Sequence, residues 1–201
     1  GLFILGDIGA NPDCKPEWLA QWGQMRAIYA QALLDIPHPK VALLSNGEED
    51  GKGNDLTRAA EPVCSELWGE RYIGVVEPKE MLKGAANVVV TDGFTGNVTI
   101  KMAEAVAGYL FEVMREEIKA RPIATVGAAM AKPALKAAGA RLDDREYGAA
   151  ILLGLNGIVM VGHGRSERDR VYFALRSTER LVKAGVLDKV RAEVAETVQK
   201  K

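Results

Sequence analysis

The sequence predicts an α/β fold in which a mainly parallel sheet is flanked by helices. Short apolar runs alternate with helical stretches, and the turns between them are rich in Gly, Asp and Asn. The chain has 201 residues, of which 48% are hydrophobic and 26% charged, so it can bury a substantial core. In such folds ligands bind beyond the carboxyl ends of the strands, which makes the turns at that edge the candidate site.

The strands are predicted from apolar runs that end in turn residues. Each run is rich in Val, Ile, Leu or Ala, and Gly, Asp, Asn, Ser or Pro follows it within a few positions. The predicted strands are, in order, residues 2–5, 40–44, 72–76 and 87–90, with two further apolar runs at 149–153 and 157–161.

The helices are predicted from apolar spacing and from Pro and Gly at their ends. Pro16 suits a first helical turn, and Pro37 stops that helix after about Leu34. A later helix is expected to begin after Asn97, and Gly185 is expected to end another one. The helix after Asn97 carries one apolar face made of Met102, Val106, Tyr109, Leu110 and Val113. Two further helices are predicted to start at Asp55 and at Pro78. Another is predicted after residue 165, and a last one at the end of the chain.

Residues 110–135 are predicted to form a helical hairpin with an apolar tip from Ile123 to Met130. A dimer-packing surface and a weak, reversible contact with a membrane surface both suit such a short, uncharged tip. We expect residues 1–201 to form a single α/β catalytic domain. Because the chain opens inside a strand and lacks an initiator Met, we expect it to be the C-terminal part of a longer chain.

Composition excludes several classes of function. A net charge of −1 does not favour nucleic acid, and no apolar stretch reaches membrane-spanning length. Two cysteines provide no disulfide framework and suit a reducing cytoplasm, and Cys64 fits the core face of a helix. No cluster has the spacing of a metal site. The segment Gly47–Lys52 is not a P-loop, because Gly53 replaces the required Ser or Thr and three carboxylates would repel phosphates.

Four loops at the predicted carboxyl edge carry the candidate chemistry. Each combines polar side chains with Gly, which allows close approach of the backbone. Any one of them could be ordinary turn chemistry, but four on one edge favour a site. The loop that follows Val88–Val90 opens a helix, whose unpaired N–H groups and dipole favour an anion. The loops supply Asp7, Gly9 and Asn11; Glu48, Lys52 and Asn54; Asp92, Thr95 and Asn97; and His163 and Arg165.

These loops resemble the bacterial phosphate acyltransferases of phospholipid synthesis, the PlsX family. The resemblance runs from about Leu5 to about Leu181, and its most specific part is the combination of Lys-Gly-Asn at 52–54 with Thr-Asp-Gly-Phe-Thr-Gly-Asn at 91–97. Further matching motifs are Asp7-Ile8-Gly9-Ala10-Asn11, Gly47-Glu48-Glu49, Lys132-Pro133, Glu146-Tyr147-Gly148 and His163-Gly164. The chain departs from the family at Gly6, where the family often has Leu.

The resemblance implies transfer of a fatty acyl group from acyl carrier protein to inorganic phosphate, giving an acyl phosphate for phospholipid synthesis. It also implies a homodimer and a fold like that of the isocitrate/isopropylmalate dehydrogenases and phosphotransacetylases. Alternatives are a phosphotransacetylase-like enzyme that uses acyl-coenzyme A and a non-catalytic binding fragment. We expect a cytoplasmic protein, with or without peripheral membrane contact, that needs no metal or cofactor.

Lys52 and Asn97 are the expected catalytic residues. Lys52 would neutralise phosphate or the developing oxyanion, and Asn97 would donate a hydrogen bond from its helix N-terminus. The expected substrate-binding residues are Asp7, Gly9, Asn11, Glu48, Gly53, Asn54, Asp92, Gly93, Thr95, Gly96 and His163.

Overall fold

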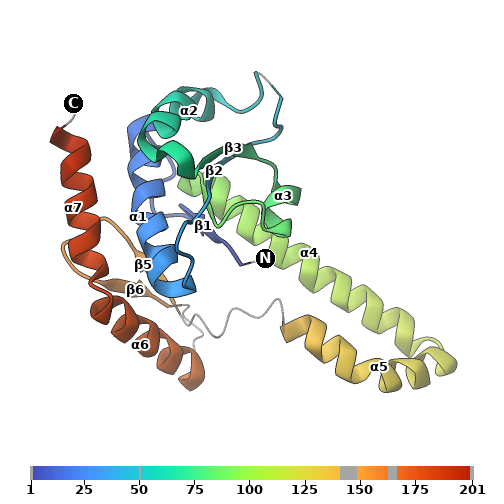
Figure 1. The fold of residues 1–201 in the computed structure, drawn as a ribbon. Coiled ribbons are helices and arrows are strands. Elements are labelled where there is room, and N and C mark those ends of the chain that lie inside the picture. The colour runs from blue at the N-terminus through green and yellow to red at the C-terminus, as the bar shows by residue number, and fades with distance from the viewer. Residues whose placement is uncertain (1, 50, 141–148, 163–166, 200–201) are drawn as a thin grey trace.

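The computed structural model describes residues 2–49, 51–140, 149–162 and 167–199. Its main sheet has four parallel strands in the order β1-β4-β2-β3, which confirms the predicted mainly parallel α/β architecture (Figure 1). The strands are β1 (Ile4–Gly6), β2 (Val41–Leu44), β3 (Tyr72–Val76) and β4 (Val88–Val90). Since all four strands run the same way, their carboxyl ends lie at one edge of the sheet.

Both faces of the central strands are buried, so β2 and β4 read as continuous apolar runs. Val41, Leu43 and Val88 belong to the core under α1 (Pro16–Leu34) and α2 (Asp55–Trp68). Successive side chains of a strand point to opposite faces, and the alternate residues pack near α3 (Pro78–Lys83). These alternate residues are Ala42, Leu44 and Val89, joined by Met81 and Ala86.

Helices α1 and α2 pack closely because a glycine faces a tryptophan. A Cβ atom on Gly23 would lie 2.1 Å from Cζ2 of Trp68, so only Gly leaves room for the indole. The Nε1–H of Trp68 donates a buried hydrogen bond of 2.7 Å to the carbonyl of Ala20. Pro16 stands at the first turn of α1 as predicted, and the helix ends where Asp35 adopts a left-handed conformation.

The other side of α1 carries a second core. Met25, Ile28 and Tyr29 pack there with residues of α6 (Arg168–Lys183) and α7 (Val186–Gln199). The two late apolar runs pair antiparallel as a separate two-stranded sheet, β5 (Ala150–Leu152) and β6 (Val159–Val161). Gly185 has a φ of 63° just beyond α6, which fits its predicted role as a helix stop.

Helices α4 (Gly93–Lys119) and α5 (Pro122–Ala140) cover residues 110–135 and project together from the rest of the molecule (Figure 1). The start of α4 corrects the sequence prediction, because the helix begins at Gly93 and not after Asn97. The apolar face of α4 is exposed: Met102, Val106 and Tyr109 keep more than half of their surface accessible. In the parts of the chain that the structure describes, no helix combines the length and apolar character needed to cross a bilayer.

Candidate active site

The first predicted loop is held in shape by one carboxylate. Asp7 follows β1, and its two oxygens accept hydrogen bonds of 2.8 Å from the backbone N–H groups of Gly9, Ala10 and Asn11 and from the Asn11 side chain. Burial raises the pKa of the Asp7 carboxyl, but these hydrogen bonds outweigh burial and hold it below its ordinary value. The Asp7 carboxylate, predicted to bind substrate, is therefore engaged in shaping the loop.

The start of α4 is capped by the protein itself. The Asp92 side chain accepts a hydrogen bond of 2.7 Å from the Thr95 N–H, and its carbonyl accepts one of 3.0 Å from Gly96. The Gly93 N–H donates to the Asn11 carbonyl at 2.8 Å. These bonds give partners to the N–H groups of Gly93, Thr95 and Gly96, so an anion at the helix start would not bind through those three groups.

Glycines lock the first loop against α4. A Cβ atom on Gly96 would lie 1.8 Å from the carbonyl oxygen of Asp7, and one on Gly93 would lie 2.7 Å from that of Asn11. The loop and the first turn of α4 are thus in backbone contact, which no other residue type would permit.

This contact brings the Asn97 side chain to the turn at Gly9. The Nδ2 atom of Asn97 is 3.4 Å from the position that a Cβ atom on Gly9 would occupy. Gly9 has a φ of 134°, a conformation that favours glycine. Two of the loops predicted to share a site are therefore adjacent, with an amide donor at their junction.

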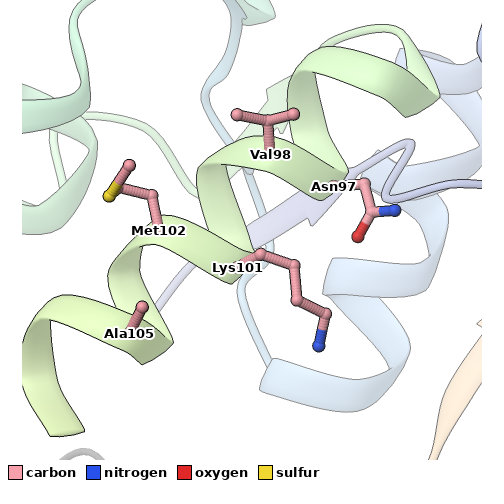
Figure 2. A pocket seen from close by; sticks show the side chains of 5 residues that line it. All are labelled: Asn97, Val98, Lys101, Met102 and Ala105. Carbon is pink, nitrogen blue, oxygen red and sulfur yellow. The ribbon is translucent and has the colours of Figure 1, made fainter.

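A shallow, open groove of about 320 Å³, lined by residues of α4 alone, lies next to Asn97. Figure 2 shows Asn97 and Lys101 on one side of the helix and Val98 and Met102 on another. Lys101 was missed by the sequence analysis, although its position four residues after Asn97 puts both on one helix face. Its ammonium group is exposed and pairs with Glu104 at 2.9 Å. The groove thus joins a polar end to an apolar wall.

The second predicted loop stands at the end of β2. The Asn46 side chain accepts a hydrogen bond of 2.8 Å from the Gly53 N–H, and the Asn54 side chain caps α2 by accepting one of 2.8 Å from Thr57. The stem of Lys52 lies against Gly47, where an added Cβ atom would come within 2.7 Å of its Cγ. Lys52 and Glu48 of this loop are both exposed, so both charges face solvent.

Strand register places the two parts of the site on the same edge. Gly6 and Leu43 both align with Val90, so the residues that follow β1, β2 and β4 emerge side by side. The described contacts include no hydrogen bond between Lys52 and Asn97. His163, the remaining predicted site residue, and Arg165 lie outside the described residues.

Neither cysteine is suited to nucleophilic attack. The Cys14 thiol donates to the Asn11 carbonyl at 3.1 Å, and burial is the main cause of a pKa above its ordinary value. Cys64 is fully buried in the core, which raises the pKa of its thiol to about 12. Among the residues that the structure describes, no three metal-ligating side chains come together. The site therefore offers hydrogen-bond donors, lysines and apolar surface.

The sequence matches the profile of a family described as fatty acid synthesis protein over residues 1–189. It is 44% identical to a phosphate acyltransferase of Elusimicrobium minutum over 98% of this chain and 57% of that protein. It is also 44% identical to a phosphate acyltransferase of Pelotomaculum thermopropionicum, over 96% of this chain and 56% of that protein. A third, from Dictyoglomus thermophilum, is 43% identical over 93% of this chain and 56% of that protein. The chain thus spans little more than half the length of the curated relatives it matches.

Proposed function

This chain belongs to the fatty acid synthesis protein family, and from that premise we propose that it carries out acyl transfer to inorganic phosphate. The acyl group comes from a thioester on acyl carrier protein, and the product is an acyl phosphate for phospholipid synthesis. The observation that carries the proposal is the Asn97 amide held against the Gly9 turn by backbone contact, beside an open groove. The finer fold assignment, to the isocitrate/isopropylmalate dehydrogenase and phosphotransacetylase group, belongs to the same proposal.

The chemistry needs positioning rather than a covalent enzyme intermediate, because a thioester is already activated. A phosphate oxygen attacks the carbonyl carbon, a C–O bond forms and the C–S bond breaks. The thiolate leaves and takes up a proton from water. Preorganised donors at the developing oxyanion supply the main stabilisation in such reactions.

Asn97 and Lys52 have separate roles in this proposal. The Asn97 amide donates a hydrogen bond to the oxyanion from a place fixed by the Gly9 turn. Lys52 neutralises phosphate as a compact point charge on the exposed loop after β2. In this proposal the groove beside Lys101 holds the substrates near these two groups.

The test is phosphate-dependent release of free thiol from acyl-acyl carrier protein by the full-length natural protein. Lys52→Ala and Asn97→Ala should each lower turnover by about 10²–10³-fold. Lys189→Ala, an exposed site on α7, is the matched control and should keep wild-type turnover. Near-normal rates for both variants would refute the catalytic roles of Lys52 and Asn97.

The names of these relatives indicate acyl transfer to phosphate but do not specify the acyl donor. Parallel assays with acyl-coenzyme A therefore decide between the carrier-protein reaction and a phosphotransacetylase-like one. Absence of phosphate-dependent release with both donors would point to a non-catalytic binding role.

The exposed apolar surface of the hairpin suits two partners. We assign the apolar face of α4, which includes Met102 and Val106, to a second copy of the chain, giving a homodimer. We assign the tip, where Ile123 is 89% and Met130 80% exposed, to weak contact with a membrane surface by a cytoplasmic protein.

Val126→Glu separates the two assignments at the tip. It should abolish co-sedimentation with anionic liposomes and leave the sedimentation mass of the protein unchanged. If liposome binding persists and the mass falls instead, the tip is a dimer surface.

A further inference from the structure

Arg26 of α1 is a cation at the foot of the site. The residue is partly buried, and its Nη1 atom is inaccessible to solvent and has no hydrogen-bond partner among the described residues. The guanidinium lies 5.6 Å from the ring centre of Trp22, within range of a cation–π contact. This environment is unusual, because buried polar groups in proteins almost always have partners.

Gly6 makes room for this side chain. A Cβ atom on Gly6 would lie 2.3 Å from Nε and 2.6 Å from Nη2 of Arg26. The guanidinium therefore fills the space that a side chain at residue 6 would take, next to Asp7 in the sequence. The positive charge is thus held under the turn that approaches Asn97.

The charge persists at neutral pH. Burial lowers the pKa of Arg26 to about 10, and the carboxylate of Asp7 is the largest effect opposing that decrease. The Asp7 oxygens already accept four hydrogen bonds from their own loop, so Asp7 interacts with Arg26 through charge and leaves Nη1 unbonded. An unbonded buried charge costs stability, and such groups concentrate at functional sites.

The edge of the sheet around the turn is otherwise acidic. Asp7 and Asp92 are buried there, and Glu48 and Glu49 stand on the loop after β2. These carboxylates repel an anion, and water screens part of the charge of the exposed lysines nearby, at 52 and 101. A buried cation acts over a longer range because less solvent screens it.

We propose that Arg26 is a positioning residue for phosphate, whose charge offsets the Asp7 carboxylate so that an anion can bind beside the turn. It acts through its charge, by way of the Asp7 carboxylate, and does not touch the substrate. The inference rests on the proposed function, because it concerns the phosphate subsite of that reaction.

Arg26→Met keeps most of the apolar stem and removes the charge. The KM for phosphate should rise about tenfold, as expected when a unit charge about 10 Å away is removed at an effective dielectric constant of about 20. The kcat should change by less than about threefold, because the lost interaction is made equally in the ground and transition states. The melting temperature should fall, because the buried Asp7 carboxylate loses the cation that offsets its charge.

Two further variants separate charge from packing. Arg26→Lys keeps the charge on a linear stem and should hold the KM for phosphate within about threefold of wild type, since the charge sets the effect. Arg180→Met removes a surface guanidinium that pairs with Asp35 and should leave the KM unchanged. Equal impairment of Arg26→Met and Arg26→Lys would mean that packing alone matters and would overturn the inference.

Calorimetric titration with inorganic phosphate provides a readout that does not depend on turnover. Wild type should bind about tenfold more tightly than Arg26→Met, a difference of about 1.4 kcal/mol. If wild type turns over and both proteins have the same KM and affinity for phosphate, the inference fails while the proposed function stands. If wild type neither turns over nor binds phosphate, both fail.

Discussion

Gly96→Ala should damage the protein, although Ala is the better helix former. The added Cβ atom would lie 1.8 Å from the carbonyl oxygen of Asp7, where ordinary contact begins at 3.4 Å. The neighbour is backbone, so no side-chain rotation relieves the clash. Either the start of α4 or the loop after β1 must move by about 1.6 Å.

The cost can be worked out from that displacement. Overpacking of this kind costs about 3 kcal/mol, the upper end of the usual range, because backbone must shift. The gain in helix propensity from Gly to Ala returns about 1 kcal/mol. A net loss of about 2 kcal/mol lowers the melting temperature of a chain of this size by about 4–8 °C. Turnover should fall by about 10²-fold, because the shift misplaces Asn97 by more than 1 Å.

Gly108→Ala is the matched control within the same helix. An added Cβ atom at Gly108 meets nothing within 4 Å, so only the propensity gain remains. Its melting temperature should rise by about 2–4 °C, and turnover should not change. Thermal unfolding followed by circular dichroism, with the thiol-release assay, measures both. A Gly96→Ala protein that gains stability together with Gly108→Ala would refute the backbone contact.

Three further predictions concern single groups. Asp7→Asn should lower the free energy of unfolding by about 1–3 kcal/mol at pH 7. The pKa of Asp7 in the folded protein lies below its ordinary value of 3.8, so the deficit should shrink as the pH falls below 3.8. Urea denaturation of both proteins at pH 7 and below pH 3.8 measures the change. Trp68→Phe loses the bond to Ala20 and should cost about 1–3 kcal/mol in urea denaturation. Cys14 should react with iodoacetamide more slowly than free cysteine, with a rate midpoint above pH 9.0, in a Cys64→Ala background.

Local signals in the sequence were enough to predict the strands of the main sheet and most helix boundaries. Pro16 marks the start of α1, α2 begins at Asp55, and the apolar run before Thr91 forms β4, all as expected. These features depend on neighbours within a few residues. The common edge of the candidate loops also followed from the sequence, because parallel strands align their carboxyl ends.

The start of α4 could not be predicted in the same way. Two glycines and an Asn between residues 93 and 97 disfavour a helix by propensity, but backbone contact with the Asp7 loop overrides that preference. The signal that was missed is Asp92, which suits the N-cap position. The exposed side of α4 shows a similar limit, because helical spacing of Met102 and Val106 predicts an apolar face without saying what covers it.

The Arg26–Gly6 contact has no local signature at all. The two residues are twenty positions apart, and each alone has an ordinary interpretation, as a helical cation and as a turn glycine. Their relationship exists only once α1 packs across β1. For the same reason the four hydrogen bonds of Asp7 could not be inferred from the carboxylate alone.

The length of α4 has a mechanical consequence. Its 27 residues make a rod about 40 Å long that is clamped near one end by the glycine contacts and free at the other. Asn97 stands about 6 Å along the helix axis from Gly93, the first of these contacts, so the lever arms measured from Gly93 differ by roughly sevenfold. A swing of about 4 Å at the far end therefore displaces Asn97 by only about 0.6 Å. A bend of the hairpin about its clamped end would therefore leave Asn97 almost in place.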